Sequence, residues 1–154
     1  MTPVNTDRIE KQVLLRAPRS RVWKALTDSK EFGAWFQAQF EAPFTPGATV
    51  QGRVTYPGYE HLTMEITIER MDAGRLFSFR WHPNAVDPGL DYSSEPTTLV
   101  EFRLEDAEGG TRLTLTESGF DRIPLVRRAA AFKSNDNGWA MQMAAIARHL
   151  EAGA

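Results

Sequence analysis

Apolar and polar residues alternate along the chain with two different periods, and these periods predict the elements. Residues 9–16 alternate with a period of two, which predicts a first strand. Pro18 suits the first turn of a helix, so a short helix is expected over residues 19–27. Asp28 provides a stop and a new cap, which predicts a second short helix that runs through Trp35.

The middle of the chain, residues 37–119, keeps a period of two. Turn sequences that contain Gly or Pro divide it into short segments, and the stretch 83–96 is expected to be a long loop. A tight hairpin is expected at Gly109. Because the alternation gives each strand one buried and one wet face, it is typical of an antiparallel sheet that is covered on one side.

The last part of the chain predicts a long amphipathic helix that begins near Pro124. Residues 134–138 are poor helix formers, so we expect a local irregularity there, with a break between two helices as the alternative. The apolar stripe comprises Leu125, Val126, Ala129 and Phe132 in its first part and Trp139, Met143, Ile146 and Leu150 in its second.

The element order is one strand, two short helices, about six strands and a long helix, which is an α+β layout. A length of 154 residues fits one domain. We expect a flexible tail over residues 1–7 and one domain over residues 8–152. A curved sheet around one helix leaves space between them, so a pocket is plausible.

Composition excludes several kinds of chemistry. The absence of cysteine excludes disulfides, thiolate nucleophiles and zinc–thiolate sites. The net charge of -2 argues against nucleic-acid binding. His61 and His82 fall on the outward strand phase without metal-ligand spacing, so we predict no metal site. With neither a secretory signal nor a long apolar run, the expectation is a cytoplasmic protein that does not contact a membrane.

Several segments resemble a known superfamily. Residues 17–28, APRSRVWKALTD, followed by the aromatic pair at 35–36, resemble the opening of START-like (Bet v 1-like, SRPBCC) proteins. The hairpin at 109–120, GGTRLTLTESGF, and the pair at 138–139 are similar to the branch called activator of heat-shock protein 90 ATPase homologue, C-terminal-domain-like. The resemblance covers about residues 8–150. It implies a helix-grip fold, in which a curved antiparallel sheet of about six or seven strands grips a C-terminal helix.

The resemblance implies three kinds of function. The leading hypothesis is non-catalytic binding of a small hydrophobic or aromatic molecule between the sheet and the C-terminal helix, without a cofactor. The second is a cyclase- or hydrolase-like enzyme that uses the same cavity. The third is a chaperone (heat-shock protein 90) co-factor, although the eukaryotic activators carry a further N-terminal domain for which this chain has no room. A monomer and a homodimer both remain open.

Most candidate ligand-binding residues share the inward strand phase or the apolar helix face. The same aromatic side chains fill the core without any pocket in the alternative reading, and Trp35 then packs against the sheet edge. Gly52, on the inward phase, favours some open volume. The candidates are Trp35, Tyr56, Phe79, Trp81, Phe102, Glu117, Trp139 and Met143.

Glu117 is the polar residue of greatest interest. It continues the apolar phase of Leu113 and Leu115, so we expect it to point inward. Because a buried carboxylate is costly unless it is paired, Glu117 is a weak candidate for a general acid or base and a candidate ligand anchor. In the alternative, a bulge near Gly119 turns it to solvent or to an arginine.

Overall fold

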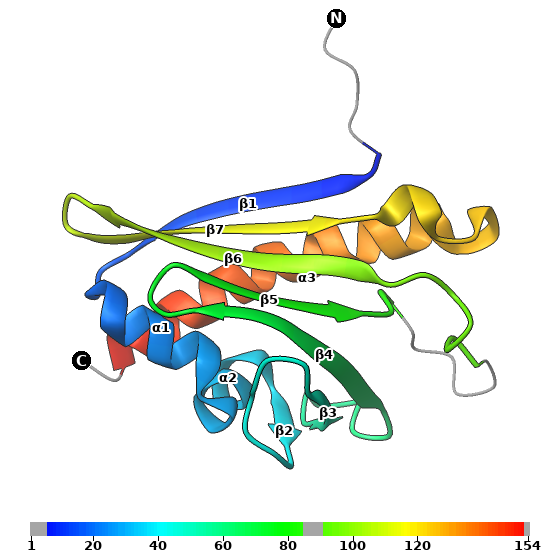
Figure 1. The fold of residues 1–154 in the computed structure, drawn as a ribbon, viewed down its shortest axis with the longest axis horizontal. Helices are drawn as coiled ribbons and strands as arrows, with labels where there is room; N and C mark the ends of the chain where they lie inside the picture. Colours follow the sequence, from blue (N-terminus) through cyan, green and yellow to red (C-terminus); the bar gives the residue numbers. More distant parts are fainter. Residues whose placement is uncertain (1–5, 85–90, 153–154) are drawn as a thin grey trace, which may run out of the picture.

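A curved antiparallel sheet wraps around one long helix in the computed structural model, which describes residues 6–84 and 91–152 (Figure 1). The strands lie in the order β1-β7-β6-β5-β4-β3-β2, and every neighbouring pair is antiparallel. The α+β helix-grip class expected from the sequence is therefore confirmed. The strands are β1 (Arg8–Leu15), β2 (Ala38–Phe40), β3 (Thr49–Val54), β4 (Thr63–Asp72), β5 (Leu76–Trp81), β6 (Thr98–Ala107) and β7 (Gly110–Ser118).

Two short helices, α1 (Arg19–Thr27) and α2 (Ser29–Phe36), connect β1 to β2, and they end where the sequence predicts. Asp28 separates them: its backbone N–H ends α1, and its carboxylate accepts hydrogen bonds from the N–H groups of Lys30 and Glu31 at the start of α2. Gln37 adopts a left-handed conformation with φ of 63° and closes α2.

The C-terminal helix α3 (Leu125–Ala152) follows a short 3-10 turn, η1 (Phe120–Arg122), and is one continuous helix. Neither the irregularity nor the break expected at residues 134–138 is present. Asn135 donates a hydrogen bond to Glu117 of β7, and Asp136 pairs with Lys11 of β1 at 2.9 Å. Because these side chains bind the sheet, they do not compete for the backbone of the helix.

Only the second part of the predicted apolar stripe is buried. Its four residues, from Trp139 to Leu150, are at most 5% exposed. Leu125 and Val126 are instead 77% and 98% exposed, so the burial expected for the first part is wrong at these positions. The first turn of α3 extends past the region where the sheet covers the helix (Figure 1).

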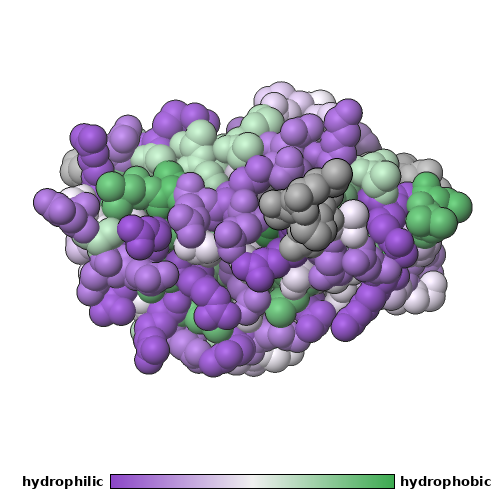
Figure 2. Space-filling view, turned by 90° about the horizontal axis from the view of Figure 1, so that it is seen from above, coloured by the Kyte–Doolittle hydropathy of each residue, from purple (hydrophilic) through white to green (hydrophobic). Residues whose placement is uncertain are grey.

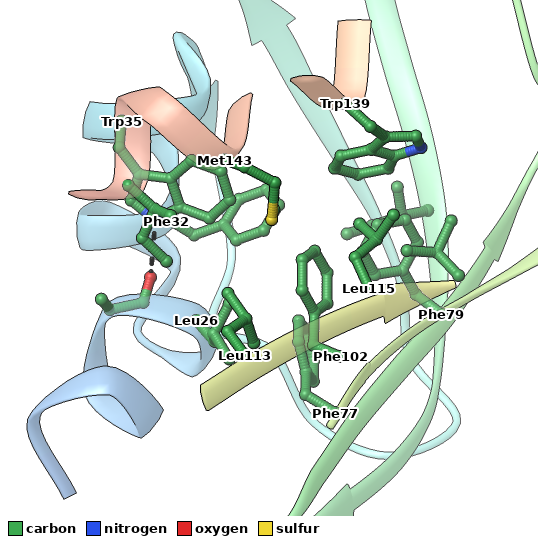
Figure 3. Packing of buried hydrophobic residues seen from close by; sticks show 14 of the residues in the cluster. Leu26, Phe32, Trp35, Phe77, Phe79, Phe102, Leu113, Leu115, Trp139 and Met143 are labelled. Atoms are coloured by element: carbon green, nitrogen blue, oxygen red, sulfur yellow. Dashed lines mark hydrogen bonds between the residues drawn. The ribbon is translucent and has the colours of Figure 1, made fainter. Parts of the chain in front are cut away.

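The interior of the sheet is filled mainly by aromatic rings (Figure 3). Phe77, Phe79 and Phe102 are fully buried, with ring centroids 5.9 to 6.2 Å apart. Phe32 of α2 packs against this group, 6.5 Å from Phe77 and 6.3 Å from Phe79. Over most of the interface between sheet and helices, therefore, the filled-core alternative describes the protein.

Two residues expected to shape a cavity do not do so. A Cβ atom at Gly52 would lie 2.7 Å from the ring of Phe40, so the volume that this glycine leaves is already occupied. Tyr56 lies beyond the end of β3, is 41% exposed and packs against Tyr59. The inward strand phase assigned to Tyr56 is wrong because the strand ends at Val54.

The face shown in Figure 2 is mostly hydrophilic, with a few separate hydrophobic areas. Among residues 6–84 and 91–152, no helix combines the length and the apolar composition that a membrane span requires. The part of the loop 83–96 that comprises residues 85–90 lies outside the described residues, as do residues 1–5 of the expected tail.

A polar cluster joins the short helices to α3. Glu31 of α2 accepts hydrogen bonds from Arg21 of α1 at 2.6 Å and from His149 of α3 at 2.9 Å. Burial raises the pKa of Glu31, but the hydrogen bonds and positive charges of His149 and Arg21 outweigh it, so the pKa lies below the ordinary value of 4.5. The ionised carboxylate therefore stabilises the folded state.

We expect Glu31→Gln to lower the free energy of unfolding at pH 7 by about 1 kcal/mol. A depressed pKa contributes stability above pH 4.5, and this contribution is lost as the pH falls through the folded pKa. The difference between wild type and variant should therefore shrink in urea titrations performed below pH 4. The half-exposed Glu10, changed to Gln, serves as the control, and a difference that does not vary with pH would contradict the assignment.

Candidate functional site

The candidate site surrounds Glu117, which lies near the end of β7 on the side of the sheet that faces α3. In the register, Glu117 lies opposite Val100 of β6 and Ile9 of β1. Its side chain is fully buried. The inward orientation expected from the strand phase is therefore observed, and the alternative in which Glu117 turns to solvent is not.

Four side chains donate hydrogen bonds to this carboxylate. On Oε2, the indole N–H of Trp81 donates at 2.8 Å and the hydroxyl of Thr98 at 2.5 Å. On Oε1, the indole N–H of Trp139 donates at 2.8 Å. The amide nitrogen of Asn135 reaches both oxygens, at 2.9 and 3.1 Å. We call these four residues and Glu117 the carboxylate cluster.

The elements bring the cluster together through simple spacing rules. Trp81 at the end of β5 lies directly opposite Thr98 at the start of β6, so both side chains leave the sheet on the same face. Asn135 and Trp139 are four residues apart on α3, and their side chains therefore share one face of the helix. Glu117 thus connects three strands to the C-terminal helix.

The hydrogen-bond chemistry of the cluster requires an acceptor at its centre. An indole N–H is only a donor, and an ionised carboxylate only accepts, so Trp81, Trp139 and Glu117 match one another. Among the described residues, no Lys, Arg or His forms an ion pair with Glu117. The negative charge is compensated by neutral donors alone. Both oxygens are engaged, so a general-base role requires that one of these donors be displaced.

A pocket of about 230 Å³ opens beside the cluster, between α3, the end of β5 and the end of α2. Three rings form its aromatic wall: the centroids of Phe36, Trp81 and Trp139 lie 5.7 to 6.1 Å from one another. In Figure 3, Trp139 extends from α3 toward the sheet residues. The pocket is lined by Phe36, Trp81, Asn84, Ser134, Asn135, Gly138, Trp139 and Gln142.

Glu117 does not line the pocket itself. Three of its donors, Trp81, Asn135 and Trp139, do, so the carboxylate lies one layer of side chains behind the wall. On the opposite side of the opening, the amide of Gln142 donates to the carbonyl oxygen of Phe36 at 3.4 Å and connects α3 to α2.

Gly138 occupies an unusual place in this wall. It lies in the middle of α3, where glycine is unfavourable relative to alanine. Its φ is not in the left-handed region, and a Cβ atom there would meet nothing within 4 Å. Packing and backbone conformation therefore do not require glycine, and the position faces the open space of the pocket.

Of the eight sequence-predicted site residues, the structure brings Trp81 and Trp139 to the pocket and Glu117 directly behind it. Phe79, Phe102 and Met143 lie in the filled core. Trp35 is buried elsewhere and donates its indole N–H to the carbonyl oxygen of Ala25 at 2.9 Å, so it connects α2 to α1 (Figure 3). Tyr56, as described above, is on the surface.

The sequence did not single out the other residues of the site. Thr98 comes before the strand that the alternation predicts from Val100 onward. Phe36 comes at the end of the second short helix, on which Trp35 is the expected buried aromatic residue. Asn135 appeared only as a poor helix former, although its spacing of four residues from Trp139 was a signal that both share one face. The lining residues that were missed are Phe36, Asn84, Ser134, Asn135, Gly138 and Gln142.

Two other hollows lie on the outside of the short helices. One is lined by residues 27–30 and 40–44, and the other lies between α2 and the end of α3 near His149. Both are lined mainly by exposed or half-exposed residues. Within the described parts of the chain, no group of three His, Asp or Glu side chains is arranged to hold a metal ion.

The curved sheet, the C-terminal helix and the pocket between them define a helix-grip domain of the START-like class. The family model described as "Activator of Hsp90 ATPase homolog 1-like protein" matches residues 16–151. The chain belongs to this family. No curated protein sequence matches it.

Several solved structures share this fold. DynU16, from the dynemicin biosynthetic locus, is 26% identical with a TM-score of 0.72; the match covers 96% of this chain but 48% of DynU16. Protein MLL2253 from Mesorhizobium loti is 18% identical over 94% of this chain and 97% of its own, with a TM-score of 0.73. Aha1 from Colwellia psychrerythraea, solved as a dimer, is 16% identical over 95% and 97%, with a TM-score of 0.70.

The carboxylate cluster leads to a stability prediction. Glu117→Gln places an amide NH₂ where indole and hydroxyl donors converge, so at least one buried donor loses its acceptor. We expect a loss of about 2–4 kcal/mol in the free energy of unfolding, measured with urea.

Glu65→Gln makes the same chemical change on the exposed face of β4, where the carboxylate contacts only Gln51 among the described residues. This control should change stability by less than about 0.5 kcal/mol. If the two variants had equal free energies of unfolding, the cluster would not contribute to the stability of the fold.

Proposed function

We propose that this protein binds a small molecule with an aromatic or apolar body in the pocket formed by α3, the end of β5 and the end of α2. The observation that carries the proposal is the open pocket with its wall of three aromatic rings, which α3 borders at Gly138 without a side chain. A glycine in a helix interior costs about 0.5–1 kcal/mol relative to alanine. Neither contacts nor backbone angles at Gly138 account for that cost, and a side chain longer than that of alanine would extend from this position into the pocket.

The chemistry of the lining supports this assignment. Phe36, Trp81 and Trp139 offer ring faces and edges for an apolar body. Asn84, Ser134 and Gln142 offer amide and hydroxyl groups that can orient a polar substituent. The volume of about 230 Å³ suits a molecule of one or two rings rather than a lipid chain or a polyketide of several fused rings.

The comparisons are compatible with this proposal. DynU16 comes from a locus for the biosynthesis of a small molecule, and this chain spans about half of its length. We infer a binding role rather than a catalytic one because the single buried carboxylate is already held by four donors.

The proposal predicts that Gly138→Leu fills the pocket and weakens binding at least tenfold. The probes are indole, benzyl alcohol and 3,3-dimethylbutan-1-ol, tested by isothermal titration calorimetry and by the shift in Tm. Gly138→Ala is the matched control: it adds only a methyl group, should retain binding, and should raise the free energy of unfolding by about 0.5–1 kcal/mol.

Two outcomes contradict the proposal. In the first, no probe binds the wild type at millimolar concentration. In the second, Gly138→Leu binds the probes as tightly as Gly138→Ala, which would mean that binding occurs elsewhere. Urea unfolding of both variants separates a filled pocket from a damaged fold.

A further inference from the structure

One buried charge lies directly behind the wall of the pocket. Its lining residues in the described part of the chain are all uncharged. Glu117 lies behind them, fully buried and without an ion-pair partner among the described residues. Because a charge in a low-dielectric interior is screened weakly, its field extends into the pocket. This charge favours a positive group over a negative one in the pocket.

The indoles of Trp81 and Trp139 lie between the charge of Glu117 and the pocket, and both are polarised by it. Trp81 and Trp139 donate their N–H groups to opposite oxygens of the carboxylate, each at 2.8 Å. A hydrogen bond to an anion polarises the donor and moves electron density toward the ring. The faces of both rings thus become more negative than those of indoles that donate to a neutral acceptor.

The three rings lie next to one another in the wall of the pocket, and each lines it. Phe36 lies 6.1 Å from Trp81 and 6.0 Å from Trp139, with tilts of 52° and 54°. A cation within about 6 Å of an aromatic centroid is attracted by the ring. Aromatic walls of this kind recognise ammonium groups that carry methyl substituents, because the methyl groups spread the charge and pack as apolar surface.

The amide of Asn135 provides a hydrogen-bond acceptor that can orient a ligand in the pocket. Its nitrogen donates to Glu117, which leaves its oxygen as the acceptor end of a side chain that also lines the pocket. An ammonium N–H or a hydroxyl on the ligand can donate to that oxygen. An anionic ligand would instead lie one layer of side chains away from the negative charge of Glu117 and be repelled by it.

We propose that the ligand of this pocket is a small organic cation, a methylated ammonium group on a short or one-ring body. The inference rests on the proposed function, since it names the chemical class that the same pocket would accept. It assigns Glu117 the role of the counter-charge that acts through the indoles of Trp81 and Trp139.

The test compares two probes of nearly equal shape. Choline and 3,3-dimethylbutan-1-ol differ in that a quaternary nitrogen replaces a carbon, so the pair isolates the charge. We expect choline to bind the full chain at least tenfold more tightly than the alcohol in calorimetric titrations at low ionic strength. Equal or weaker binding of choline overturns the inference while leaving the proposed function intact.

If neither probe binds, and neither do indole and benzyl alcohol, the proposed function itself fails and the inference fails with it. The failures of the two proposals are therefore distinguishable. Competition between choline and indole provides a further check that both occupy one site: choline bound elsewhere would not displace indole, and this result would also overturn the inference.

Two variants test separately whether the ring of Phe36 and the charge of Glu117 contribute to the preference for choline. Phe36→Leu keeps the apolar surface but removes one ring, and Phe36 donates nothing to Glu117; it should reduce choline affinity at least threefold and leave the alcohol unchanged. Tyr59→Leu, at an exposed ring far from the pocket lining, is its control. Loss of affinity for both probes in Phe36→Leu would indicate a role in shape alone and contradict the inference.

Glu117→Gln removes the charge directly. If the variant remains folded, choline affinity should fall about tenfold, the size expected for one charge acting across a layer of side chains, and the preference over the alcohol should disappear. A folded Glu117→Gln protein that keeps the full preference overturns the inference. If the variant does not fold, Phe36→Leu and the probe pair decide the question.

Discussion

The architecture depends on one buried anion. Glu117 is inside the sheet without a cationic partner among the described residues, and a carboxylate in that position is tolerated only when its lone pairs are filled by donors. Those donors come from the end of β5, the start of β6 and two adjacent turns of α3. The helix must therefore lie over the sheet at one height and one rotation for the charge to be satisfied.

The pocket lies at the end of the interface where this carboxylate is held. Elsewhere between the sheet and the helices, rings such as Phe32, Phe77 and Phe102 pack against each other and leave no room (Figure 3). Near Glu117 the indoles of Trp81 and Trp139 stack on one another and also direct their N–H groups to the carboxylate. Gly138 borders the same end of the interface without a side chain, and the pocket lies beside it.

The period-two pattern predicted the sheet and the inward orientation of Glu117 and Trp81 because strand phase is a local property. The same pattern gave wrong predictions at positions whose environment is set by contacts with other elements. Tyr56 keeps the phase of β3 but lies past the end of the strand. The space at Gly52 is filled by Phe40, from a strand of three residues that is too short to show a period. Asn135 donates to an acceptor on another element, and helix propensities, which describe single residues, carry no information about such a partner.

The wall supplied by α3 separates two kinds of residue by a single step along the helix. Ser134, Gly138 and Gln142 repeat every four residues and line the pocket without binding Glu117, whereas Asn135 and Trp139, one position later than the first two, hold the carboxylate. Substitutions in the first row can reshape the pocket while the second row preserves the fold. The shape of the pocket and the stability of the fold are therefore controlled by different residues of the same helix.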